Sequence, residues 1–155
     1  TSTGVKLIEY NARLGDPEAM NVLSLLQSDF LTICLGIVDG TLDRVDIRFA
    51  NLATVCKYAV PNGYPDKPVK DEPINLSNVK NQERLFYASV DIKNGQLIET
   101  GSRTAAVVGI ANTISDAEKI AEKEISSFEG PLFHRNDIGT DKLIQKRVHH
   151  MESIR

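Results

Sequence analysis

The dipeptide Asn94-Gly95 constrains the fold of this chain more than any other sequence feature. Asn and Gly accept the positive φ angles of a type I′ turn, and such two-residue turns join adjacent antiparallel strands. Runs with strand-like composition flank the dipeptide and occur elsewhere in the chain: residues 49–60, 85–92, 96–100 and 104–110. The second half of the chain is therefore predicted to form an antiparallel sheet, interrupted by a long loop at residues 61–84.

Helical patterns lie before and after these strand-like runs. They occupy residues 17–27, 30–38, 115–128 and 142–155. Asp16 is placed to cap the first helix with Pro17 at its first position, Asp29 to cap the second, and a capping box from Ser115 to Glu118 to open the third. The prediction is an α+β fold in two parts. Residues 1–46 form a strand plus helices, and residues 47–155 form a small antiparallel sheet with helical cover.

Composition narrows the class of protein. Apolar residues make up 41% of the chain and charged residues 25%, which is typical of a folded globular protein. The net charge of −3 gives no electrostatic reason to expect nucleic acid or an anionic membrane as partner. Cys34 and Cys56 lie far apart in apolar runs, which favours buried reduced thiols and a cytoplasmic location. Polar residues interrupt the longest apolar stretch, residues 22–38, so a membrane span is not expected.

A run of ten residues from Glu9 to Glu18 carries the most distinctive polar chemistry. If its first half is a strand, the two-residue period turns Glu9, Asn11 and Arg13 to one face. Carboxylate and amide oxygens are ligands of Mg²⁺, and a guanidinium suits a phosphate or a carboxylate. The run therefore predicts a metal site and an anion contact that lead directly into a helix. On spacing alone, a solvated polar face remains the alternative, as does a salt bridge from Arg13 to Asp16 or Glu18.

The same run resembles the Glu-x-Asn-x-Arg segment that ends an ATP-grasp catalytic domain. Its continuation, Leu14-Gly15-Asp16-Pro17-Glu18, is similar to the glycinamide ribonucleotide synthetase family, also called phosphoribosylamine–glycine ligases, with Leu14 in place of the usual Phe. Three later segments also resemble that family: Gly63-Tyr64-Pro65, Gly101-Ser102-Arg103 with Ser for Gly, and Arg135-Asn136-Asp137-Ile138-Gly139. The resemblance covers nearly the whole chain and concerns the C-terminal part of the family.

The resemblance implies a function. Glu9 and Asn11 would hold Mg²⁺ or Mn²⁺, and Arg13 would have a catalytic and nucleotide-binding role. The complete enzyme would use ATP to join glycine to 5-phosphoribosylamine through a glycyl phosphate, in purine biosynthesis, giving glycinamide ribonucleotide, ADP and phosphate. Residues 1–46 would end the ATP-grasp domain and residues 47–155 would be the C-terminal domain. The expected partners are these small molecules and the missing N-terminal part of the same enzyme.

Several alternatives stay open on the sequence. No glycine-rich phosphate loop precedes Glu9 and no Walker-type motif occurs, so this chain by itself is expected to be an inactive fragment of a ligase. Another ATP-grasp ligase or carboxylase, or a non-catalytic scaffold or interaction module, would carry some of the same features. Asp16 is expected to be a helix cap rather than a substrate contact. Arg103 either reaches the site from the second part or is a surface arginine.

Overall fold

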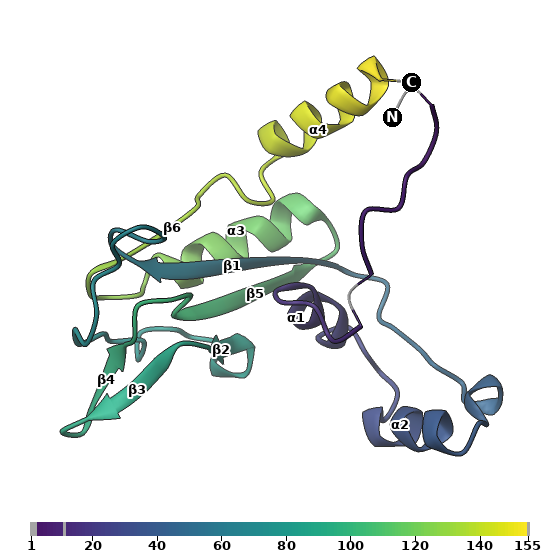
Figure 1. Ribbon diagram of the computed structural model, residues 1–155, viewed down its shortest axis with the longest axis horizontal. Coiled ribbons are helices and arrows are strands. Elements are labelled where there is room, and N and C mark those ends of the chain that lie inside the picture. Colours follow the sequence, from purple (N-terminus) through teal and green to yellow (C-terminus); the bar gives the residue numbers. More distant parts are fainter. Residues whose placement is uncertain (1–2, 11, 155) are drawn as a thin grey trace.

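The structure, a computed structural model, describes residues 3–10 and 12–154. Its elements follow the order α1 (Glu18–Leu23), α2 (Phe30–Val38), η1 (Leu42–Arg44), β1 (Ala53–Pro61), η2 (Gln82–Arg84), β2 (Leu85–Tyr87), β3 (Val90–Lys93), β4 (Gln96–Glu99), β5 (Ala105–Ala111), α3 (Ile114–Ile125), β6 (Leu132–His134) and α4 (Asp141–Ser153). Figure 1 shows α3 lying along the sheet while α2 and α4 project away from it. The predicted α+β class with antiparallel strands is confirmed.

All pairings in the main sheet are antiparallel, and its strand order is β2-β5-β1-β6. The hairpin β3-β4 forms a separate two-stranded sheet. Asn94 and Gly95 connect it with φ angles of 52° and 77°, as a type I′ turn requires. The predicted hairpin is confirmed. The predicted single strand over residues 85–92 is wrong, because β2 pairs with β5 whereas β3 pairs with β4.

Helix α3 covers one face of the main sheet and completes the hydrophobic core. A Cβ atom added at Gly109 in β5 would lie 1.9 Å from the carbonyl oxygen of Ala117, so only glycine allows this close approach. Ala117 and Ala121 are fully buried where the helix meets the strand. Further core residues come from β1, the loop after β1, β2, β5 and the end of α3: Val55, Ala59, Ile74, Leu76, Val79, Leu85, Ala105, Val107 and Ile125.

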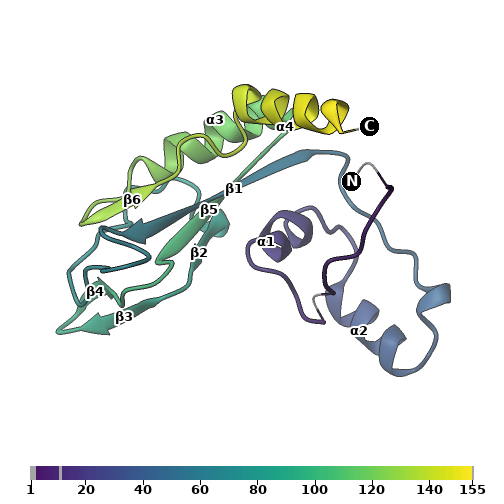
Figure 2. The same cartoon turned by 45° about the horizontal axis from the view of Figure 1, so that its top comes forward.

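The opposite face of the sheet has a smaller apolar cluster. Cys56, Ala106 and Val108 are buried there, and Met20 of α1 packs against them. Figure 2 shows α1 on this side of the sheet, with α2 farther from it. Strand β1 therefore separates two environments, because alternate side chains face α3 or α1. Among the helices within the described residues, none is both long and apolar enough to cross a membrane.

The N-cap predicted for α2 is confirmed, and the one predicted for α3 is not. Asp29 caps α2, its carboxylate accepting a hydrogen bond from the Thr32 N–H at 2.6 Å, as expected. The capping box predicted from Ser115 to Glu118 is wrong by two residues. Thr113 is the N-cap of α3 and accepts a hydrogen bond from the Asp116 N–H at 3.1 Å. The Thr-x-x-Asp spacing offers the same chemistry two residues earlier, because Asp116 can accept a hydrogen bond from the Thr113 hydroxyl.

Candidate functional site

The segment with the predicted metal ligands is exposed and has no regular secondary structure in its described residues, 4–10. Val5, Ile8 and Tyr10 are 100%, 94% and 85% exposed. Glu9 lies among them with an exposed side chain, and Asn11 lies outside the described residues. The predicted strand is therefore wrong for the described part of this segment. A strand without a neighbour leaves its backbone N–H and C=O groups unpaired, so it is not stable alone.

Arg13 is also exposed, and within the described residues no ion pair joins it to Asp16 or Glu18. Its Nη1 donates to the carbonyl oxygen of the adjacent Leu14 at 3.3 Å. This local bond leaves most of the guanidinium available to a ligand. Glu9 and Arg13 are thus accessible to a ligand, and the same segment contacts the sheet farther along, at Asp16.

Asp16 joins this segment to the sheet and does not cap α1. The helix begins at Glu18, directly after Pro17, and has no side-chain cap. The Tyr58 hydroxyl donates to Asp16 Oδ1 at 2.9 Å, and Arg103 Nη2 lies 3.2 Å from Asp16 Oδ2. The predicted cap is wrong because these partners offer a charge-assisted hydrogen bond and an ion pair instead of one backbone N–H. We call Asp16, Tyr58 and Arg103 the Asp16 cluster.

Arg103 holds the Asp16 cluster together from the turn before β5. Its Nη1 also donates to the Asp16 carbonyl oxygen at 3.3 Å, and its guanidinium lies 5.4 Å from the centroid of the Tyr58 ring. Of the two roles considered for Arg103, the geometry places it beside the Glu9–Glu18 run rather than alone on the surface. A cation over an aromatic ring adds to the ion pair, since the ring face carries negative potential.

Burial keeps the two titratable groups of β1 beside Asp16 protonated. Desolvation, followed by the hydrogen bond to Asp16 and its negative charge, raises the pKa of Tyr58 above its ordinary value, with Arg103 opposing the shift. Desolvation and Asp16 likewise raise the pKa of the Cys56 thiol to about 12. Tyr58 therefore acts as a hydrogen-bond donor. Cys56 is a buried thiol rather than a nucleophile, because the thiolate is the reactive form.

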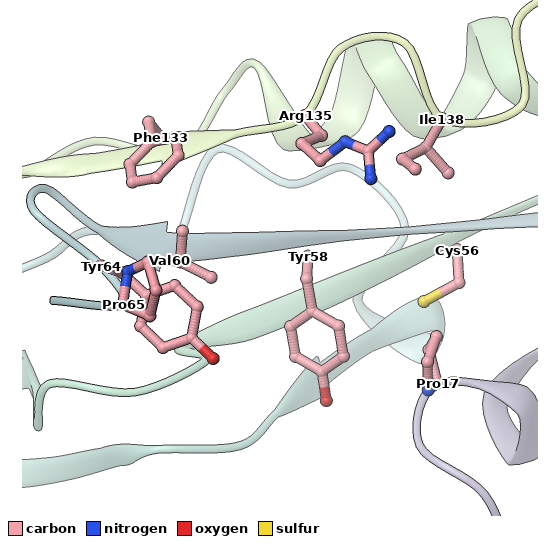
Figure 3. A pocket seen from close by; sticks show the side chains of 9 residues that line it. All are labelled: Pro17, Cys56, Tyr58, Val60, Tyr64, Pro65, Phe133, Arg135 and Ile138. Atoms are coloured by element: carbon pink, nitrogen blue, oxygen red, sulfur yellow. The ribbon is translucent and has the colours of Figure 1, made fainter. Parts of the chain in front are cut away.

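A pocket of about 410 Å³ opens beside the Asp16 cluster. Figure 3 shows Tyr58 at its centre, the Tyr64-Pro65 turn at one end, Cys56 and Pro17 at the other, and Arg135 opposite. The complete lining is Pro17, Cys56, Tyr58, Val60, Tyr64, Pro65, Phe133, Arg135 and Ile138. Three segments that carried the sequence resemblance therefore meet here, and the fourth supplies Arg103 to the adjoining cluster.

Arg135 is held at the pocket by its neighbour Asp137. Arg135 Nε donates to Asp137 Oδ1 at 3.0 Å and Nη2 donates to Oδ2 at 2.8 Å, which is a bidentate pair. The hydrogen bonds from Arg135 lower the pKa of Asp137. The two hydrogen bonds orient the Arg135 guanidinium toward the Asp137 carboxylate.

On the opposite face of β1, Lys57 anchors the loop that carries Arg135 and Ile138. Its side chain is 1% exposed, and Nζ lies 2.7 Å from Glu118 Oε1 and 2.5 Å from Glu122 Oε2. Lys57 Nζ also donates to the Asn136 carbonyl oxygen at 3.0 Å. We call Lys57, Glu118 and Glu122 the Lys57 network. It ties β1, α3 and the segment after β6 together.

The Lys57 network was not predicted, although the sequence carries two signals for it. Lys57 is a lysine in an otherwise apolar strand run, at a position that the two-residue period turns toward α3. Glu118 and Glu122 are four residues apart and so lie on one face of that helix. A lone cation in a core strand requires a charged partner, because an unpaired buried charge is very costly.

The described residues do not assemble a complete metal site. Within 3–10 and 12–154, no group of three His, Cys, Asp or Glu side chains converges on one point. The exposed Glu9 carboxylate is an oxygen donor of the kind that Mg²⁺ or Mn²⁺ binds, and Asn11 lies outside the described residues.

The chain is similar to known proteins over nearly its whole length. The family model described as "Phosphoribosylglycinamide synthetase, C domain" matches residues 54–141. Phosphoribosylamine–glycine ligases of Methanococcus vannielii and Methanocella arvoryzae are 55% and 52% identical over 99% and 100% of this chain. The chain spans only 35% and 36% of those relatives. A crystal structure of phosphoribosylamine–glycine ligase from Thermotoga maritima matches 85% of this chain and 33% of its own, with 28% identity and a TM-score of 0.71.

Proposed function

Because this chain belongs to the phosphoribosylglycinamide synthetase family, we propose that it supplies the C-terminal part of an ATP-dependent ligase. The complete enzyme joins glycine to 5-phosphoribosylamine and releases ADP and phosphate. ATP activates the glycine carboxylate as a glycyl phosphate, which the amine then attacks. The product is glycinamide ribonucleotide, an early compound of purine biosynthesis, and the enzyme works in the cytoplasm.

The observation that carries this proposal is the meeting of distant segments on one face of the sheet. Asp16 from the first run contacts Tyr58 of β1 and Arg103 from the turn before β5. The pocket beside them is lined by Pro17, the Tyr64-Pro65 turn and the segment after β6. The ion pair with Arg103, together with the hydrogen bond from Tyr58, supports a fixed approach of this run to the C-terminal sheet.

We assign the residues of the run separate roles. Glu9 and Asn11 hold the divalent cation, which neutralises negative charge on the nucleotide phosphates when it is bound. Arg13 contacts a phosphate or the activated carboxylate, where its fixed positive charge stabilises developing negative charge. Asp16 positions the run through Tyr58 and Arg103. The further metal ligand and the adenine contacts come from the preceding part of the enzyme.

The proposal also divides the chain in two. Residues 1–46 complete an ATP-grasp catalytic domain, and residues 47–155 form the C-terminal domain. Support comes from the family match, which begins at residue 54, and from the sheet, whose first strand begins at Ala53. The strand predicted around Glu9 forms, on this view, only beside the strands of the preceding domain.

The test compares the full-length polypeptide that contains this chain with the 155-residue chain. With Mg²⁺-ATP, the full-length protein is expected to form ADP only when glycine and 5-phosphoribosylamine are both present. The chain alone is expected to form no ADP above background, since it lacks the segments that bind ATP. Replacing glycine by bicarbonate tests for a related carboxylase. The proposal would be overturned if ADP formation required bicarbonate instead of glycine, or if it required neither of the two.

A further inference from the structure

Glu99, the last residue of β4, carries a fully buried carboxylate, with an exposed fraction of 0%. Its side-chain partners in the part of the chain that the structure describes are backbone N–H groups. The Gly101 N–H donates to Glu99 Oε2 at 2.8 Å, and the Glu72 N–H makes a weaker bond to Oε1 at 3.5 Å. A buried carboxylate destabilises a protein unless its oxygens accept hydrogen bonds. Glu99 and the backbone at Gly101 therefore fix each other in place.

The hydrogen bond from Gly101 holds one end of the turn between β4 and β5. Gly101 has a φ of 91°, a conformation that is open to glycine and that other residues rarely adopt. At the other end of the turn, the Thr104 N–H donates to the Ala59 carbonyl oxygen of β1 at 2.9 Å. Arg103 lies between these two attachments, so the Glu99 carboxylate helps to set where its side chain starts.

Arg103 connects this turn to the first run of the chain. Its guanidinium pairs with Asp16 Oδ2 at 3.2 Å and donates to the Asp16 carbonyl oxygen at 3.3 Å. Asp16 belongs to the run that also supplies the proposed metal ligands, Glu9 and Asn11. A shift of the Arg103 guanidinium would therefore weaken the hold of the sheet on this run.

Building on the proposed function, we propose that Glu99 is a positioning residue of the ligase reaction. Because it is buried, it acts at a distance from the substrates. Its carboxylate holds the Gly101 N–H, the turn then keeps Arg103 against Asp16, and this contact keeps the run in place for the cation. The effect depends on an oxygen that accepts the hydrogen bond, which is stronger when that oxygen is charged.

The test measures the concentration of free Mg²⁺ that gives half of the maximal rate of ADP formation by the full-length protein. This concentration does not depend on how much of the protein is folded, so a merely structural role would leave it unchanged. Glu99→Met keeps a similar length and removes the acceptor, and it is expected to raise the half-activating concentration about fivefold. Glu99→Gln keeps a neutral acceptor and should raise it only about twofold.

A double-mutant cycle tests the path through Arg103. Arg103→Gln already lacks the ion pair with Asp16, so adding Glu99→Met to it should change the half-activating concentration by less than about twofold. Asp91→Asn is the matched control, because Asp91 is an exposed carboxylate on the other strand of the same hairpin. This control should behave as the wild type.

Hydrogen exchange of the α1 amides gives a readout apart from activity, on the full-length protein without Mg²⁺ or ATP. Glu99→Met is expected to speed this exchange about threefold, because a less well-placed Arg103 holds Asp16 more weakly. Amides of β1 should keep their protection. Unchanged α1 exchange in a folded Glu99→Met protein would contradict the proposed path.

The inference is overturned if Glu99→Met has the half-activating concentration of the wild type, or if its effect persists in full beside Arg103→Gln. An equal effect of Glu99→Gln and Glu99→Met would also overturn it, since the acceptor oxygen would then not matter. If Glu99→Met does not fold, Glu99→Gln decides alone, and a wild-type value overturns the inference. A wild-type protein without ligase activity instead defeats the proposed function, and α1 exchange then tests the hold of Glu99 on Arg103.

Discussion

The two regions of this molecule, residues 3–52 and 53–154, differ in where they put their apolar side chains. In the second region the strands and α3 bury a continuous core that includes Val55, Val107 and Ile125. In the first region, Gly36 is the one buried residue among those the structure describes. The comparison teaches that the second region builds a core from its own residues, whereas the first region leaves most of its large apolar side chains exposed.

The largest expected effect concerns the predicted metal ligand of the first region. In the full-length enzyme, Glu9→Ala is expected to lower kcat/KM by roughly a thousandfold or more, because it removes the negatively charged ligand of the proposed metal site. Steady-state kinetics at limiting Mg²⁺ measure the loss. His149→Ala in the exposed α4 is the control and should stay within about twofold of wild type. Near wild-type kinetics for Glu9→Ala would show that the first region carries no metal ligand there.

The next largest effect tests how far the second region depends on its own contacts. Lys57→Met is expected to lower the free energy of unfolding by about 3 kcal/mol, because it leaves Glu118 and Glu122 facing each other without their cation. Urea unfolding of the 155-residue chain measures the change. Lys93→Met breaks an exposed pair with Asp71 and should cost less than about 1 kcal/mol.

A triple variant separates packing from charge in the Lys57 network. Lys57→Met combined with Glu118→Gln and Glu122→Gln removes the repulsion as well as the cation. It is expected to recover part of the loss, since replacing a whole buried ion pair costs less than breaking it. No recovery would mean that the lysine stem, rather than its charge, stabilises the second region.

The same contrast explains how much of the fold could be predicted. The hairpin at Asn94-Gly95 and the helix after Asp29 depend on backbone preferences within a few residues, so the sequence was sufficient for both. The short strand β6 was missed, because Leu132–His134 is a strand only through its pairing with β1. The strand predicted around Glu9 is not formed in the described residues 4–10, because no neighbouring strand pairs with this segment there.

The candidate site, like the fold, could be predicted from the sequence only where local residues decide it. Sequence could identify Glu9 and Arg13 as unusual polar residues, and it could not show that Asp16 would leave the helix terminus for Tyr58 and Arg103. Those partners are 42 and 87 residues away, so only tertiary structure decides the competition. The Lys57 network is similar, since its charges come from β1 and α3. Whether Glu9 and Asn11 share a metal remains a prediction.

A moderate effect is expected where the two regions meet. Arg103→Gln removes the ion pair with Asp16 and the contact with the Tyr58 ring, which together are expected to contribute about 1 kcal/mol at this half-exposed position. Hydrogen exchange of the α1 amides should become about fivefold faster, while amides of β5 keep their protection. Arg135→Gln is the matched control, since its partner Asp137 is only two residues away. Unchanged exchange in α1 would show that the Asp16 cluster does not hold the regions together.

The smallest expected effect is the pH dependence of the second region through Glu122. Burial alone would raise the pKa of this carboxyl, but hydrogen bonds from Lys57 and His134 prevail and lower it below the ordinary value of 4.5. Below pH 4.5 the unfolded chain therefore binds a proton more readily than the folded chain, so this contribution to stability is present above pH 4.5 and is lost as the pH falls through the lower folded value. Urea unfolding between pH 6 and pH 3 is expected to show this decline. Glu122→Gln should be less stable at pH 6 and should lose less stability on acidification than the wild type. An equally steep decline in Glu122→Gln would assign the acid sensitivity to other carboxylates and would separate it from the Lys57 network.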